Sequence, residues 1–190
     1  MSDGLPGWRV RSSRLVVDDR WLRLRADSCE TAEGVAIDPF YVIETADIAA
    51  CVALTRRQEL VLVRQYRHGY QGVTLELPAG RLDALEDPVT AARRELREET
   101  GYVSSDARAL RSFSPNTLRY TNRLHTVLLT NAEPGTPAND PTERIEVALW
   151  PLARAEELFV HPDFANATFA GSLAIGLQAL RRETLLPAST

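Results

Sequence analysis

The pattern of apolar and polar positions predicts short strands through the first half of the chain. Residues 48–54 form a continuous apolar run, as expected of a strand that is covered on both faces. Polar residues 18–20 separate two short apolar runs and predict a hairpin turn. By the same criteria, strands are predicted at residues 15–17, 21–25, 40–44, 60–66, 73–77, 124–130 and 145–150.

The clearest helix prediction covers residues 87–100. Asp87 suits the N-cap and Pro88 suits the first helical position, where a missing N–H costs nothing. Gly101 suits the position after the last turn, which commonly adopts a left-handed conformation. These signals indicate where this helix begins and ends.

Two more helices are predicted after the last strands, at residues 153–159 and 167–182, and residues 131–142 are predicted to be a loop. Because strands outnumber helices and the helices lie between and after them, the order indicates an α+β or layered α/β/α domain. We expect an N-terminal β extension at residues 1–45, which is a candidate dimerisation part, and the main domain at residues 46–190.

Composition and charge exclude several classes of protein. The chain has 190 residues with 44% hydrophobic and 25% charged content, which is ordinary for a globular protein and unlike a disordered chain, collagen or a coiled coil. Its net charge of −4 argues against a general nucleic-acid binder, although all 22 basic residues are arginines, which suit phosphate. No apolar run approaches the length of a membrane span.

The two cysteines, Cys29 and Cys51, fit neither a zinc spacing nor a secreted disulfide framework. We therefore expect reduced thiols and a cytoplasmic location. The three histidines are scattered, and we do not expect them to form a metal site.

The predicted helix at residues 87–100 carries an acidic face. On a helical wheel Glu95, Glu98 and Glu99 share a sector about 100° wide. Like charges at these spacings destabilise an isolated helix by roughly 0.2–0.5 kcal/mol per pair. A divalent cation would relieve the repulsion, and oxygen ligands favour Mg²⁺ or Mn²⁺. Taken alone, the segment favours a solvated acidic face, and the residues around it decide between the two interpretations.

The residues around these acids extend the pattern. The motif begins with a glycine, followed after five residues by a glutamate. After seven more residues it continues as Arg-Glu-apolar-x-Glu-Glu-x-Gly-apolar. The chain matches it with Gly80, Glu86, Arg94, Glu95, Leu96, Glu98, Glu99, Gly101 and Tyr102. The seven fixed residues of the motif arise by chance on the order of once in 10⁸ start positions. The pattern resembles the Nudix box, from which only the aromatic Tyr102 departs mildly.

The resemblance implies a fold and a chemistry. Nudix proteins are mostly hydrolases of a nucleoside diphosphate linked to another moiety, with a mixed sheet between helices and a loop–helix–loop that binds Mg²⁺ or Mn²⁺. The residues matching the metal ligands are Glu95, Glu98, Glu99 and, through its carbonyl, Ala79. Glu98 and Glu99 are also the catalytic candidates. Gly80, Glu86, Arg94 and Gly101 match positions that shape and brace the motif.

Two segments outside the box, residues 63–67 and 76–80, resemble the ADP-ribose pyrophosphatase branch of the family. Such enzymes split ADP-ribose into AMP and ribose 5-phosphate and are usually homodimers. Residues 116–123 depart from the continuation usual in this branch, so NADH and GDP-mannose remain alternative substrates. A nucleotide-sensing module without hydrolysis is a further alternative, against which the intact carboxylates weigh.

The substrate-binding candidates are Arg64, Glu76, Arg119 and Arg123. Strand alternation places Arg64 and Arg67 on opposite faces, so both cannot reach one ligand, and Arg64 is the phosphate candidate if it faces the Glu76 end of the sheet. Arg119 and Arg123 are candidates either to bind phosphate or sugar, or to cap loop carbonyls.

The general base is expected from a loop before a late strand, because the resemblance places it there. Glu143 is the candidate, with Asp140 and Glu146 as rivals. Trp21 is the aromatic candidate to stack on a base if a partner's strand reaches the site.

Overall fold

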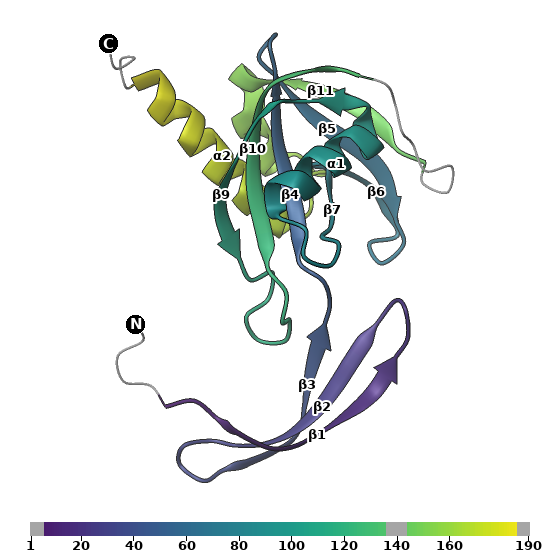
Figure 1. Cartoon of the computed structure of the whole chain (residues 1–190), viewed down its shortest axis with the longest axis vertical. Helices are drawn as coiled ribbons and strands as arrows, with labels where there is room; N and C mark the ends of the chain where they lie inside the picture. The colour runs from purple at the N-terminus through teal and green to yellow at the C-terminus, as the bar shows by residue number, and fades with distance from the viewer. Residues whose placement is uncertain (1–5, 136–143, 186–190) are drawn as a thin grey trace. The chain divides into compact units, whose positions relative to one another are not determined.

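The computed structural model describes residues 6–135 and 144–185 (Figure 1). The chain divides into two compact units. The first comprises Met1–Ala46 and Ser114–Arg123, and the second comprises Asp47–Phe113 and Leu124–Thr190. The chain therefore leaves and re-enters the second unit through residues 114–123, which the sequence pattern did not predict.

The first unit is built on an antiparallel sheet of β1 (Arg9–Asp18), β2 (Arg23–Glu30) and β3 (Ala36–Glu44), in that order. The predicted hairpin is confirmed, and Asp19 closes its turn by accepting the backbone N–H groups of Trp21 and Leu22 at 2.7 and 2.8 Å. Residues 114–123 join at β3, where the Ile43 N–H donates to the Arg119 carbonyl at 2.8 Å.

The second unit contains a mixed sheet in which β4 (Ile48–Thr55) and β10 (Leu124–Pro134) are parallel and the other pairs are antiparallel. The main strand order is β11-β5-β4-β10-β8. The other strands of this path are β5 (Glu59–Arg67), β8 (Tyr102–Val103) and β11 (Glu146–Pro151). Beside it, β6 (Gly72–Glu76) pairs with β5, β7 (Ala79–Arg81) with β4, and β9 (Asp106–Phe113) with β10.

The helix α1 (Pro88–Thr100) has the predicted ends. The Asp87 side chain accepts the N–H groups of Val89 and Thr90, and Gly101 has a left-handed φ of 73°. A 3₁₀ helix, η1 (Leu152–Val160), replaces the second predicted helix, and α2 (Ala167–Leu185) is the third. No helix within residues 6–135 and 144–185 is long and apolar enough to cross a membrane.

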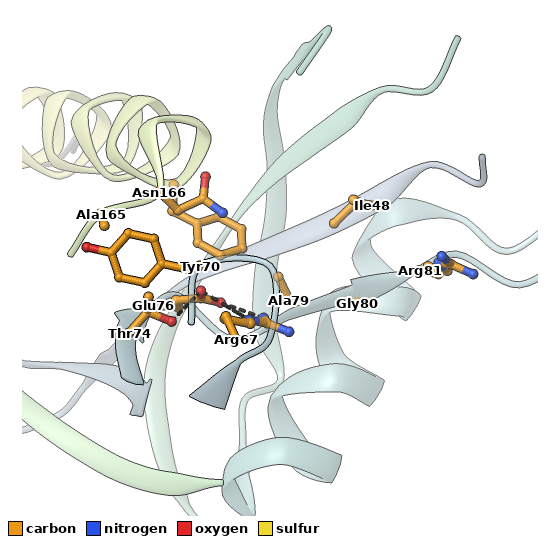
Figure 2. Close-up of a pocket in the computed structure, with 11 residues that line it drawn as sticks. Ile48, Arg67, Tyr70, Thr74, Glu76, Ala79, Gly80, Arg81, Ala165 and Asn166 are labelled. Atoms are coloured by element: carbon orange, nitrogen blue, oxygen red, sulfur yellow. Dashed lines mark hydrogen bonds and ion pairs between the residues drawn. The ribbon is translucent and has the colours of Figure 1, made fainter. Parts of the chain in front are cut away.

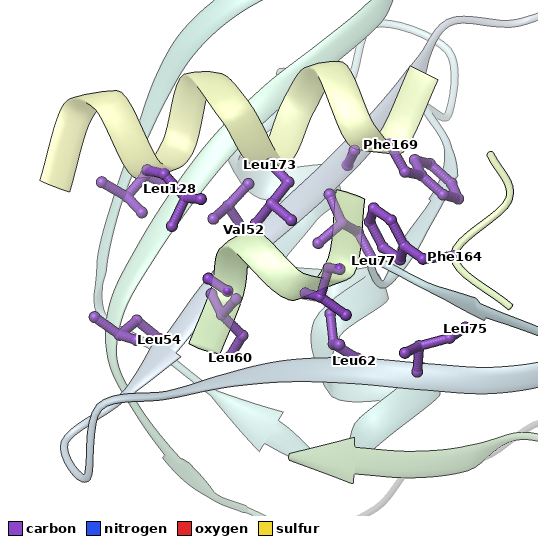
Figure 3. Close-up of a cluster of buried hydrophobic side chains, with 14 of the residues drawn as sticks. Val52, Leu54, Leu60, Leu62, Leu75, Leu77, Leu128, Phe164, Phe169 and Leu173 are labelled. Carbon is purple, nitrogen blue, oxygen red and sulfur yellow. The ribbon is translucent and has the colours of Figure 1, made fainter. Parts of the chain in front are cut away.

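Side chains of β4 alternate between two cores. On one face, α1 packs over the strand in a cluster that includes Ala49, Cys51, Ala53, Ala91, Ala92 and Leu96. On the other, η1 and α2 pack in a cluster that includes Ala50, Val52, Leu54, Leu158, Phe169 and Leu173 (Figure 3). The predicted α+β class, with a mixed sheet between helices in an α/β/α sandwich, is confirmed, since the apolar run of β4 is covered on both faces.

Three strands, β7, β8 and β9, were not predicted from the sequence. β7 and β8 are very short, and β9 exposes most of its side chains because it pairs only with β10. The predicted loop at residues 131–142 is wrong at its start, because β10 continues to Pro134 by pairing with β8. The strand predicted at residues 73–77 ends at Glu76, before the residue that precedes Pro78.

Candidate active site

The acidic face of α1 abuts the short strand β7. Glu99 accepts the backbone N–H of Ala79 at 3.0 Å through Oε2. Glu95 and Glu98 lie on the same side of the helix, where one nitrogen of Arg94, Nη1, donates to both carboxylates at 2.7 and 3.1 Å. The structure therefore places Glu99 against Ala79 and links Glu95 to Glu98 through Arg94 on the same face of the helix.

Gly80 is required here because of close approach. A Cβ added at Gly80 would lie 2.0 Å from Cδ and Oε1 of Glu95, so the carboxylate rests directly against the glycine. The backbone of Gly80 is not in the left-handed region, where only Gly34 and Gly101 are found among the described glycines. Glycine at this position thus makes room for the Glu95 carboxylate and is not needed for a left-handed turn.

Arg94 links the helix to the loop that precedes it. Its Nε and Nη2 donate to the two oxygens of Glu86 at 3.1 and 2.9 Å, and Nη2 also donates to the carbonyl of Arg81 at 2.9 Å. The hydrogen bond to Glu86 raises the pKa of Arg94 above its ordinary value, and Arg94 in turn lowers the pKa of Glu86. This geometry is that of a brace between loop and helix.

The donor set fits a hard divalent cation by its chemistry. Three carboxylates and a backbone carbonyl supply only oxygen, and glycine leaves room for Glu95 beside the strand. Within the part of the chain described, no three acidic, histidine or cysteine side chains are already arranged around one point. Glu98 contacts Arg94, and since the Glu98 side chain is 38% exposed, water can replace that contact at little cost.

A cavity of about 470 Å³ borders β7 (Figure 2). It shares Ala79, Gly80 and Arg81 with the site above. Its remaining lining comes from β4, from β5 and β6 with their turn, and from the start of α2, and consists of Ile48, Arg67, Tyr70, Thr74, Glu76, Ala165, Asn166 and Phe169. The cavity and the acidic helix face therefore meet at the residues of β7.

A buried carboxylate organises this cavity. Glu76 is 2% exposed and accepts Nη2 of Arg67 at 2.5 Å and the hydroxyl of Thr74 at 2.7 Å. Arg64, the predicted phosphate contact, does not line the cavity, and its nearest carboxylate is Asp163 at 3.9 Å. Strand alternation does separate the two arginines, but it is Arg67 that shares the face of Glu76.

The other predicted contacts lie in the first unit or outside the described residues. Arg119 donates to the carbonyl of Tyr41 at 3.1 Å and lies over the ring of Phe40, which favours the carbonyl-capping interpretation. Arg123 also belongs to the first unit. Trp21, in the β1–β2 turn, is 69% exposed.

Of the three candidates for the general base, only Glu146 lies within the described residues. Glu143 and its rival Asp140 lie outside the described residues. The second rival, Glu146, is exposed at the start of β11, opposite Arg64 in the neighbouring strand.

Sequence reasoning predicted only Glu76 among the polar side chains that line the cavity and missed Arg67, Tyr70, Thr74, Arg81 and Asn166. Arg67 could have been found, because Arg67 and Glu76 point to one face once β5 and β6 pair as a hairpin. Tyr70 lies in the turn between these strands, and Asn166 accepts the N–H of Thr168 at the start of α2. No local pattern distinguishes these two from ordinary turn and capping residues.

Comparison with known families covers both units of the chain. The model described as NUDIX domain matches residues 45–169, and the model described as nucleoside diphosphate sugar hydrolase N-terminal domain matches residues 8–43. The first match covers more than half of the chain.

Curated relatives and solved structures agree with these matches. A CMP-5'-(N-acetyl-N-hydroxy-3-aminopropyl)phosphonate hydrolase from Streptomyces rubellomurinus is 30% identical over 173 residues, which cover 91% of this chain and 82% of the relative. An ADP-ribose pyrophosphatase from Mycobacterium tuberculosis is 33% identical over 138 residues, or 70% and 67% of the two chains. A crystal structure of an ADP compounds hydrolase shares the fold, with a TM-score of 0.87, 24% identity and coverage of 97% and 100%.

Proposed function

This chain belongs to the Nudix family of hydrolases, and we propose that it cleaves the diphosphate bond of an ADP compound. ADP-ribose, split into AMP and ribose 5-phosphate, is the proposed substrate. The observation that carries the proposal is that Glu99 and Glu95 contact Ala79 and Gly80 of β7, with Glu98 linked to Glu95 through Arg94. Beside them lies a cavity with a paired arginine and a buried glutamate. Relatives named ADP-ribose pyrophosphatase support this choice.

In the proposed site, the carboxylates of Glu95, Glu98 and Glu99 and the carbonyl of Ala79 would hold Mg²⁺, with Mn²⁺ as an alternative. Such a cation supplies charge screening for the diphosphate and acidifies the attacking water. Glycine at position 80 lets the Glu95 carboxylate lie against the strand, and it thereby fixes where the donor set meets the substrate.

The remaining residues of the proposed site bind the substrate and accept a proton. Arg67, held by Glu76, presents planar donors that suit a phosphate or sugar hydroxyl at the cavity wall. Glu98, whose side chain is 38% exposed, can exchange its contact with Arg94 for the cation that would bind the diphosphate. We retain Glu143 as the predicted general base that removes the proton of the attacking water.

The nucleoside part of the substrate has a second candidate. The relative from Streptomyces rubellomurinus acts by its name on a CMP compound, so a cytidine-linked substrate is a specific second candidate. NADH and GDP-mannose remain alternatives. A sensing module that binds without hydrolysis is less well supported, because all motif carboxylates are present.

We also propose that the protein is a homodimer. The first unit exposes large apolar side chains on and beside its sheet, among them Trp8 at 50%, Val10 at 53% and Trp21 at 69%. Apolar surface gathered in this way usually marks an interaction site, and a second copy of the chain would cover it. Light scattering at micromolar concentration tests this, and a monomer would contradict it. The cytoplasmic location remains a prediction.

The experiment that tests the function is a substrate panel with purified protein and Mg²⁺. ADP-ribose, NADH, GDP-mannose, a CMP-linked phosphonate and nucleoside triphosphates are incubated separately, and the release of nucleoside monophosphate or pyrophosphate is measured. We expect AMP from ADP-ribose, suppressed by chelation and reduced about 100-fold or more in E98Q and E99Q. E33Q, at an exposed glutamate of the first unit, is the matched control. Activity on triphosphates alone would contradict the proposal.

A further inference from the structure

Three polar side chains of the second unit form a hydrogen-bonded chain away from the carboxylates of α1. Nδ1 of His125 lies 2.7 Å from the hydroxyl of Ser112, and Nε2 lies 2.9 Å from Oδ2 of Asp47. A carboxylate only accepts hydrogen bonds, so Nε2 of His125 carries a proton and donates to Asp47. In neutral His125, the Ser112 hydroxyl then donates to Nδ1. The histidine is thus held from both sides, with its side chain 16% exposed.

The position of this chain is defined by the sheet. Ser112 on β9 pairs with His125 on β10, His125 pairs with Ala49 on β4, and Ala49 pairs with Gly80 on β7. His125 therefore lies in the same cross-strand row as the glycine that seats Glu95. Asp47, Ser112 and His125 also lie within two residues of the three points where the chain enters or leaves the second unit.

Asp47 connects this chain to the loop before α1. Its carbonyl accepts the N–H of Leu82 at 2.9 Å, immediately after Arg81, whose carbonyl is held by Arg94. Four residues further, Glu86 accepts from Arg94 as well. Residues 81–86 are therefore fixed at one side by Asp47 and at the other by Arg94, which also contacts Glu95 and Glu98.

The order of contacts is the reverse of a serine-hydrolase triad, in which Nε2 faces the serine and Nδ1 the carboxylate. We propose instead that His125, acting through Asp47, is a positioning residue for the loop of residues 81–86 and, through Arg94, for the metal-binding carboxylates of α1. This inference rests on the proposed function only for the metal. The link from His125 to the loop stands on the hydrogen bonds alone.

Two measurements on the same variants test the proposal. Amide hydrogen exchange of residues 81–86 is followed in the metal-free protein, with the amides of α2 as an internal reference. The dissociation constant for Mn²⁺ is measured by calorimetric titration without substrate. The variants are H125A, H125Q, whose side-chain amide can still donate to Asp47, and H68A, at an exposed histidine in the turn between β5 and β6.

We expect H125A to accelerate exchange at residues 81–86 by about 2- to 10-fold, the factor that corresponds to one ordinary hydrogen bond. The Mn²⁺ dissociation constant should rise by a similar factor. H125Q should restore both values, and H68A should match the wild type.

Unchanged exchange at residues 81–86 in H125A would overturn the positioning role. So would faster exchange that extends equally to α2, because that result indicates a general loss of stability. Failure of H125Q to restore the loop would also overturn it. If the wild type bound no Mn²⁺, the proposed function would fail, whereas the exchange measurement would still decide whether His125 fixes the loop.

Discussion

Replacing Gly80 with alanine separates the function of the acidic face from the stability of the fold. The new methyl group would lie 2.0 Å from Cδ and Oε1 of Glu95 and 2.3 Å from Oε2. The carboxylate has to retreat by roughly 1.4 Å to reach the 3.4 Å of an ordinary contact. Because these atoms end a rotatable side chain and the backbone at Gly80 suits alanine, the side chain moves and the strand stays in place.

The displacement of Glu95 predicts two effects of different size. Stability should fall by at most about 1 kcal/mol, the net value of the hydrogen bond between Arg94 and Glu95 that is disturbed. Turnover should fall by about 100-fold, because a misplacement of about 1 Å in a catalytic group has that effect.

Two glycines of α2 provide the controls. A Cβ at Gly176 would lie 2.5 Å from Cγ1 of Val52, a buried and branched side chain, whereas nothing lies within 4 Å at Gly171. Both variants gain helix propensity equally. G176A should therefore be less stable than G171A by about 1–3 kcal/mol, and its folded fraction should keep normal turnover.

The assay combines thermal unfolding with AMP release from ADP-ribose at increasing Mg²⁺. We expect G80A to lose about 100-fold in turnover with little change in stability, G176A to be active but destabilised, and G171A to be normal in both. Wild-type turnover and Mg²⁺ dependence in G80A would refute the argument that turnover depends on the position of the Glu95 carboxylate against Gly80. A loss of stability in G80A as large as in G176A would show that the strand had moved.

Three further predictions concern single side chains. R94K should reduce turnover about 10- to 100-fold in the same assay, because lysine cannot bridge Glu86 and α1 as the planar guanidinium does; an unchanged rate would contradict the brace. R67A should raise KM for ADP-ribose more than R64A does, since only Arg67 lines the cavity; equal effects would reject this distinction. Burial raises the pKa of Asp27, but hydrogen bonds from Arg25 and Ser13 outweigh this effect and leave the pKa lowered. The Asp27 carboxylate therefore stabilises the fold at pH values above the unfolded-state pKa of about 4. This stabilisation is lost as the pH falls from there through the lowered pKa of the folded state. Thermal unfolding between about pH 5 and pH 3 should therefore depend less on pH in D27N, and parallel curves would contradict it.

The parts of this protein that could be predicted from the sequence are those with a local cause. The ends of α1 follow from Asp87, Pro88 and Gly101, each of which acts on its own turn. The helical-wheel analysis of the sequence correctly predicted that Glu95 and Glu98 lie on one face of α1, because helix geometry is regular. The apolar run of β4 likewise indicated a strand between two layers.

The parts that could not be predicted depend on pairing between distant residues. Asp47 and His125 are separated by 78 residues and meet because β4 and β10 are parallel neighbours, which no local pattern records. β9 exposes most of its side chains, so its apolar pattern is weak. The choice between Arg64 and Arg67 required the register of β5 against β6, in which Arg67 and Glu76 share a face.

The most direct test of the central claim is Mn²⁺ binding, measured by calorimetry in the wild type and in a variant with Glu95, Glu98 and Glu99 all changed to glutamine. Both proteins are then assayed with ADP-ribose. The account predicts one or more bound ions and AMP release in the wild type, with both lost in a variant that remains folded. Equal binding by the two proteins, or AMP release that survives the triple substitution, would contradict it.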